Sequence, residues 1–208
     1  MNFRKSAILT ALFLMMVFMV CSCVMSDSVS DSDDDDDDEP GDDDGGSTDD
    51  DANIEGVWTD PDSELMWQNT AEVGSDTQLN YYEAEQYCGN LSLGALNGWR
   101  MPTISELRSL LRGCTGTMEG GACGVTDECS LIDNCWTDAC DGCSDNGGPG
   151  TGGAYWSEDL VGSIEASYWS STRGDIDEYD LLINFESGRI NYWPSVEESF
   201  GSIRCVRP

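Results

Sequence analysis

Histidine is absent from this 208-residue chain, and basic residues are scarce. Nine Lys and Arg stand against 41 Asp and Glu, which gives a formal net charge of −32 at pH 7. The lack of histidine excludes Ser–His–Asp triads, histidine general bases and histidine-ligated metal centres. The scarcity of positive charge excludes nucleic acid as a partner, because a negative surface repels the phosphate backbone.

The chain also lacks an apolar run of about 20 residues, the length that a membrane-spanning helix needs. Its N-terminal apolar stretch, residues 7–20, has 14 residues and follows Arg4 and Lys5. A short apolar core after positive residues is typical of a secretory signal peptide. We therefore expect the protein to be exported.

The segment that ends this core, Val20-Cys21-Ser22-Cys23, resembles the lipobox of bacterial lipoproteins. In a lipobox the chain is cut before a cysteine that carries lipid. Cys23 fits this role best, because the small Ser22 precedes it and Val20 stands at the aliphatic position. We predict a signal peptide over residues 1–22, lipid attachment at Cys23 and a membrane partner, the cell outer membrane, with the protein periplasmic or surface-exposed. A plain signal peptide with incidental cysteines is the alternative.

Residues 23–52 form a low-complexity acidic segment. Residues 26–52 alone hold 14 Asp, one Glu and no basic residue. A sequence with so little apolar surface to bury does not fold by itself. We predict a lipid-anchored, disordered tether with a root-mean-square reach of roughly 30 Å. The alternative, a calcium-binding repeat, would need spaced ligands and a fixed glycine turn that this run does not show.

Ten cysteines are many for a chain of this length. In an exported protein they indicate disulfides, whereas in the cytosol they would suggest metal or redox chemistry. Without Cys21 and Cys23 an even number remains, as four bridges require: Cys88, Cys114, Cys123, Cys129, Cys135, Cys140, Cys143 and Cys205. Cys140 and Cys143 also match the C-x-x-C pattern of zinc ribbons and thiol oxidoreductases, with Cys129 and Cys135 as further zinc ligands. Acidic neighbours disfavour a reactive thiolate there, so we predict structural disulfides.

Residues 53–208 carry the patterns of one α+β domain. Capping boxes predict two helices, one capped by Asn80 with Glu83, the other capped by Thr103 with Glu106 and ending at Gly113. Short strands are expected at residues 57–59, 65–67, 168–172, 179–185, 189–193 and 203–206. Between 113 and 165 the periodicity disappears and cysteine and glycine dominate. This segment, called the insert below, is predicted to be a long loop ordered by disulfides.

A set of motifs runs in order through this domain: VWTDPDSELMWQ, YYEAEQYC, GWRMPTISELRSLL, YWSST, INFESGRI and IRCVRP. Together they resemble the DUF1566 family, also called the Lcl C-terminal domain family, a bacterial branch of the C-type-lectin-like fold. The resemblance implies two helices flanking a twisted antiparallel sheet, with a long disulfide-rich loop insert. It also implies a disulfide between Cys88 and Cys205, from the first helix to the last strand. The six cysteines of the insert would then pair among themselves, with fifteen pairings open.

The resemblance implies recognition more than catalysis. The adhesin that gives the family its name binds sulfated polysaccharide, but the acidic domain here should repel sulfated ligands. The triplets of calcium-dependent sugar-binding lectins, such as Glu-Pro-Asn or Trp-Asn-Asp, are missing. We expect a recognition or adhesion module without a cofactor, not an enzyme, whose ligand is a surface glycan or protein. The alternatives are a structural envelope protein and an enzyme related to formylglycine-generating proteins.

The insert supplies the candidate ligand-binding residues, because loops on a rigid scaffold commonly carry function. The expected stacking residues are the aromatic side chains Trp136, Tyr155 and Trp156. Nearby carboxylates offer polar contacts: Asp133, Asp138, Asp141 and Asp145. A further acidic cluster, Asp175, Asp177, Glu178 and Asp180, is a candidate calcium site, with a solvated turn as the alternative.

Overall fold

The computed structural model describes residues 54–70, 73, 78–130, 135–174, 179–194 and 199–208. The chain divides into a unit of residues 1–48 and a unit of residues 49–208, and every described residue belongs to the second unit. The predicted signal peptide, Cys23 and most of the acidic tether belong to the first unit, and they lie outside the described residues. In the described part of the chain no helix has the length and apolarity needed to cross a membrane.

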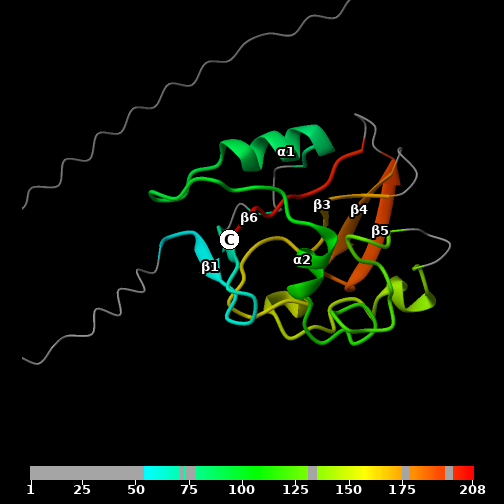
Figure 1. Cartoon of the computed structure of the whole chain (residues 1–208). Coiled ribbons are helices and arrows are strands. Elements are labelled where there is room, and N and C mark those ends of the chain that lie inside the picture. Colours follow the sequence, from blue (N-terminus) through cyan, green and yellow to red (C-terminus); the bar gives the residue numbers. More distant parts are fainter. Residues whose placement is uncertain (1–53, 71–72, 74–77, 131–134, 175–178, 195–198) are drawn as a thin grey trace, which may run out of the picture. The chain divides into compact units, whose positions relative to one another are not determined.

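The described residues form an α+β domain with two small antiparallel sheets, each of three strands (Figure 1). The first sheet has the order β1-β2-β6 and contains β1 (Val57–Thr59), β2 (Met66–Gln68) and β6 (Val206–Arg207). The second has the order β3-β4-β5 and contains β3 (Ser167–Arg173), β4 (Tyr179–Asn184) and β5 (Arg189–Pro194). The α+β class is as predicted, but two sheets stand where a single sheet was expected. Both ends of the domain meet in the first sheet, because β6 pairs with β2.

Two helices begin at the predicted capping boxes. In α1 (Tyr81–Asn90) the Asn80 side chain accepts a hydrogen bond from the Glu83 backbone N–H at 3.0 Å, and the Glu83 carboxylate accepts from the Asn80 N–H at 3.0 Å. The same reciprocal pair forms between Thr103 and Glu106 at the start of α2 (Ile104–Ser109). These bonds satisfy backbone donors that the helix itself leaves unpaired.

The second helix is shorter than predicted, ending at Ser109 and not at Gly113. The turn after it tightens, with the Leu110 N–H bonded to the Leu107 carbonyl at 3.2 Å. The Arg112 N–H then donates to the Tyr155 carbonyl at 2.9 Å, so the chain has left the helix to pair with the insert. A tertiary hydrogen bond thus overrides the local helical pattern.

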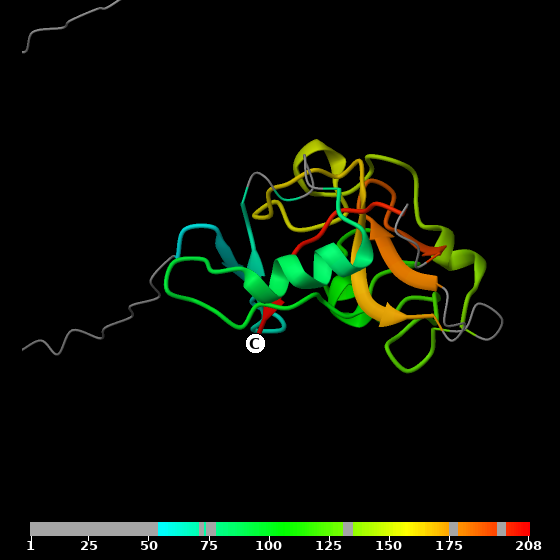
Figure 2. The same cartoon turned by 90° about the horizontal axis from the view of Figure 1, so that it is seen from above.

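The two helices lie against opposite faces of the second sheet. Side chains alternate along a strand, so neighbouring residues of β4 face opposite sides. Leu182 belongs to one hydrophobic cluster, with Ala84 of α1, whereas Leu181 and Ile183 belong to another, with Leu107 of α2. Figure 2 shows the two sheets at opposite ends of the domain with α1 lying between them.

Four disulfides brace this arrangement. Cys88 of α1 is bonded to Cys205, directly before β6, with an S–S distance of 2.02 Å, and this is the pair that the family resemblance implies. Within the insert the bonded pairs are Cys114–Cys143, Cys123–Cys140 and Cys129–Cys135. In the described residues of the insert the helical elements are two short 3-10 helices, η1 (Asp138–Asp141), which includes Cys140, and η2 (Thr151–Gly153), which follows the bridges. Disulfides therefore take the place of regular structure in the insert.

Candidate functional site

Two of the three aromatic residues predicted to contact a ligand are in the core. Tyr155 is 3% exposed and Trp156 is 1% exposed, so the expectation that they stack on a ligand is wrong. Tyr155 is held by a hydrogen bond from its hydroxyl to the Ser144 carbonyl. Trp156 packs on Arg204, which is completely buried with its guanidinium 4.8 Å from the centre of the Trp156 ring. Arg204 donates hydrogen bonds to the Gln68 and Val161 carbonyls at 2.6 and 2.5 Å. Trp156 thus covers a buried cation, a cation–π contact that fixes this part of the insert.

The third aromatic residue, Trp136, is half-buried at the margin of the core. Its ring meets the ring of Tyr192 edge-on, with centroids 5.5 Å apart, and Tyr192 meets Tyr179 in the same way at 5.7 Å. Such edge-on contacts stabilise aromatic pairs. Trp136 thus packs the insert against β5, and its expected contact with a ligand stays a prediction.

The predicted carboxylates of the insert that the structure describes do not form a shared site. Asp138, Asp141 and Asp145 are exposed, and Asp133 lies outside the described residues. Asp141 forms an ion pair with Arg189 of β5 at 3.1 Å. Nowhere in the described ranges do three or more acidic or cysteine side chains group as metal ligands would.

The candidate calcium cluster after β3 is described at one residue. Asp175, Asp177 and Glu178 lie outside the described residues. Asp180 is fully buried in β4, where its carboxylate lies 3.8 Å from the Arg173 guanidinium. This carboxylate therefore belongs to the interior of the sheet, not to a solvated turn.

The C-x-x-C motif has neither of the reactive roles that its pattern allows. Cys140 is bonded to Cys123 and Cys143 to Cys114, so both sulfurs of the motif are taken by other partners. Cys129 and Cys135, the further zinc ligands of that hypothesis, are bonded to each other. A thiolate is what both zinc binding and thiol exchange require, and a disulfide sulfur supplies none.

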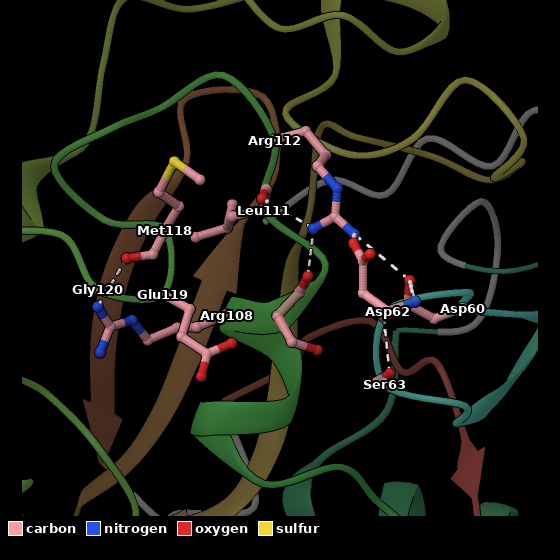
Figure 3. A pocket seen from close by; sticks show the side chains of 10 residues that line it. Asp60, Asp62, Ser63, Arg108, Leu111, Arg112, Met118, Glu119 and Gly120 are labelled. Carbon is pink, nitrogen blue, oxygen red and sulfur yellow. Dashed lines mark hydrogen bonds and ion pairs between the residues drawn. The ribbon is translucent and has the colours of Figure 1, made fainter.

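The structure instead contains a concave site that the sequence did not reveal (Figure 3). We call it the hollow, and its volume is about 500 Å³. Residues 60–63 of the β1–β2 turn, residues 108–112 at the end of α2 and residues 118–120 of the insert contribute to its lining. In Figure 3 the turn and the insert segment lie on opposite sides, with α2 between them. Its size is within the range of sites that bind small molecules or single side chains.

The turn on the first side is built around Asp60. This residue is buried, and its carboxylate accepts hydrogen bonds from the Ser63 hydroxyl at 2.7 Å and from the Asp62 N–H at 3.4 Å. The Asp60 carbonyl also accepts from the Glu64 N–H at 2.8 Å, and Glu64 has a positive φ of 61°. An aspartate that bonds to the backbone two residues later stabilises a tight turn.

Arg112 joins this turn to the end of α2. Its Nη2 lies 3.4 Å from a carboxylate oxygen of Asp60 and 3.2 Å from one of Asp62 (Figure 3). Its Nη1 donates to the carbonyls of Ser109 and, at 3.1 Å, of Leu111. The guanidinium thus also satisfies carbonyls left open where the helix ends.

Arg108 organises the opposite side. This α2 side chain is buried, and it donates hydrogen bonds to four carbonyls of the insert: Thr117, Met118, Cys123 and Val125. Among the described residues no carboxylate lies within ion-pair distance of it. Burial lowers the pKa of the Arg108 guanidinium, although the nearby Glu119 carboxylate raises it; an arginine remains charged in either case. The Arg108 guanidinium of α2 therefore fixes the path of residues 117–125.

Sequence reasoning gave Arg108 and Arg112 no role and so missed both. A usable signal was their rarity, because residues 53–208 contain seven Arg and no Lys. Scarce cations in so acidic a domain are candidates for specific contacts, and Arg108 and Arg112 each bond to several partners.

Comparison with known proteins bears on this whole domain. The model of the Lcl C-terminal domain family matches residues 56–207, which include both sheets, both helices and the insert. Searches of curated proteins and of solved structures gave no match. The family is one of extracellular and surface domains. With a match over most of its length, the chain belongs to the Lcl C-terminal domain family.

Proposed function

We propose that this protein is a surface recognition module that binds its ligand in the hollow. The observation that carries the proposal is the construction of the site. Its two sides are held by Arg108 of α2, which bonds to the insert, and by Arg112, just after α2, which bonds to the β1–β2 turn. A site whose sides are fixed before binding loses little conformational entropy when a ligand enters.

The N-terminal part of the chain suits this role. A lipid on Cys23 would hold the protein at the outer membrane, and the acidic segment over residues 23–52 would keep the domain away from the lipid surface. The domain would then meet ligands on the cell surface or in the periplasm. We propose no cofactor and no catalytic step, since the function needs neither.

The acidity of the domain limits the ligand. Residues 53–208 hold 26 acidic residues against seven arginines, and sulfated polysaccharides would be repelled by such a surface. A glycan without sulfate and a protein with positive charge are both compatible with it. A C-type-lectin-like fold, with its ligand face on long loops, is part of this proposal because the insert forms one side of the hollow.

The experiment fills the hollow. Ser109 lies in its lining, and replacing it by tryptophan (Ser109→Trp) would occupy much of the space. The matched control is Ser92→Trp, at an exposed position after α1 that is not part of the lining. Full-length proteins would be compared for binding to cells and envelope fractions that lack the endogenous protein. Near-ultraviolet circular dichroism and disulfide mapping would show that both variants fold.

We expect Ser109→Trp to lose at least tenfold in binding and Ser92→Trp to bind like the unaltered protein. Equal binding by both folded variants would overturn the hollow as the ligand site. Absence of binding by the unaltered protein to any envelope fraction would instead favour a structural envelope role.

A further inference from the structure

Most hydrogen-bond donors in the lining of the hollow already have partners within the protein, whereas some acceptors have none among the described residues. The terminal nitrogens of Arg112 already engage two carboxylates and two carbonyls, and Arg108 engages four carbonyls. The Ser63 hydroxyl donates to Asp60, and the Ser109 hydroxyl donates to the Glu106 carbonyl at 2.7 Å. The strong donors of the lining are therefore largely occupied.

Acceptors remain available. Glu119 is exposed at the rim, and within the described ranges its carboxylate has neither a hydrogen bond nor an ion pair. Asp62 faces it from the turn, 81% exposed, with Arg112 near one of its two oxygens. A carboxylate accepts several hydrogen bonds, so both side chains can take a donor from a ligand.

Part of the lining is apolar, beside Arg108, Ser109 and Arg112, whose donors are already bonded within the fold. Leu111 and the half-buried Met118 both contribute to it. A methionine side chain is flexible and adapts to the shape of an inserted group. Apolar side chains in the lining, with acceptors at the rim, match a ligand that has an aliphatic stem and a charged donor at its tip.

We infer that the hollow binds the side chain of an arginine or lysine presented by a partner protein. This inference rests on the proposed function and names its ligand. Arginine and lysine have the required shape, with an apolar stem and a cationic tip that is rich in donors. The acidic domain would also steer a basic partner toward the site. The Glu119 carboxylate receives the cationic group, and Met118 packs against its stem.

The test uses a single cationic side chain as the probe. N-acetyl-arginine amide carries the guanidinium without charged termini, and N-acetyl-citrulline amide has nearly the same shape without the charge. Binding to the full-length chain would be measured by calorimetry and nuclear magnetic resonance. Glu119→Gln removes the rim carboxylate, and Glu158→Gln is its control, because Glu158 is exposed but outside the lining.

We expect Glu119→Gln to weaken binding of the arginine probe about fivefold, as for the loss of one exposed charge-assisted hydrogen bond. Glu158→Gln removes the same single negative charge and should change binding less than twofold. This variant controls for general attraction of the cationic probe to the acidic chain. The citrulline probe should bind at least fivefold more weakly than the arginine probe. N-acetyl-lysine amide should bind in the same way as the arginine probe.

Equal effects of Glu119→Gln and Glu158→Gln would overturn the inference, and so would equal binding of the two probes. Tighter binding of glucosamine than of either amino-acid probe would overturn it in favour of an amino-sugar polymer. If Ser109→Trp still abolishes surface binding in any of these cases, the hollow remains the ligand site. Its ligand is then not an arginine or lysine side chain. If Ser109→Trp binds normally, the proposed function fails whatever the probes show.

Discussion

Replacing Arg108 by methionine should destabilise the insert more than any surface substitution in this domain. The change keeps most of the side-chain volume and removes the donors that four carbonyls of residues 117–125 use. These carbonyls belong to a segment without regular structure, so the lost bonds have no backbone replacement. Arg108→Met therefore removes the group that determines the path of this loop.

The size of the effect follows from the geometry. A hydrogen bond from a charged donor contributes about 1.5–3 kcal/mol, but contributions from one side chain do not add. The Met118 carbonyl can turn to water, because this residue is only half-buried, whereas the other three acceptors belong to buried residues. The disulfides at Cys114 and Cys123 also keep the loop near its native position. We expect a loss of about 2–4 kcal/mol in the free energy of unfolding.

Urea denaturation of the full-length chain, under non-reducing conditions, would measure this loss. Arg189→Met is the matched control, because Arg189 forms an ion pair in which both side chains are more than half exposed. Such a pair contributes roughly 0–1 kcal/mol. Arg108→Lys should recover less than half of the loss, since an ammonium cannot reach four carbonyls spread around a planar guanidinium. A change below 0.5 kcal/mol for Arg108→Met would refute the role assigned to this residue.

Three further predictions concern the scaffold and the anchor. The double variant Cys88→Ser/Cys205→Ser opens a loop of 117 residues and should lose about 4–5 kcal/mol in urea denaturation, with an undiminished midpoint contradicting the prediction. Burial would raise the pKa of Glu106, but hydrogen bonds from Arg100 and the Thr103 backbone outweigh it and hold that pKa below its usual value. This stability is present above the unfolded-state pKa of about 4.3 and is lost as the pH falls through the lower folded-state pKa, so Glu106→Gln should flatten the decline of the melting temperature below pH 4. Mass spectrometry of the mature N-terminus should find lipid on Cys23, and a free amine on any later residue would contradict the anchor.

Much of the scaffold could be predicted because its signals are local. The capping boxes at Asn80 and Thr103 each depend on two side chains three residues apart. The turn between β4 and β5 contains Gly188, whose φ of 66° suits glycine, and the strands on its two sides pair in an antiparallel hairpin. The end of α2 was wrong by four residues, because the bond from Arg112 to the Tyr155 carbonyl spans 43 positions and leaves no local pattern.

The candidate site could not be predicted for the same reason. Its lining comes from three separate segments, and the contacts that join them involve backbone carbonyls, which any residue type supplies. For Trp156 the sequence predicted a ligand contact that the structure does not show. An aromatic residue in a glycine-rich loop suggested exposure, but the partner that buries it, Arg204, lies 48 positions later in the sequence.

The arginines explain how so acidic a domain folds, and what it presents outward. Arg108 and Arg204 are buried against carbonyls, while Arg100 and Arg112 engage carboxylates and carbonyls of the same fold. Most of the few arginines thus form contacts within the fold, and they neutralise few of the exposed Asp and Glu side chains. The negative surface therefore follows from the placement of the arginines as well as from their small number. Because that surface attracts cations over distances of about a Debye length, association with a basic partner should slow as the salt concentration rises, whereas binding of a neutral ligand should not.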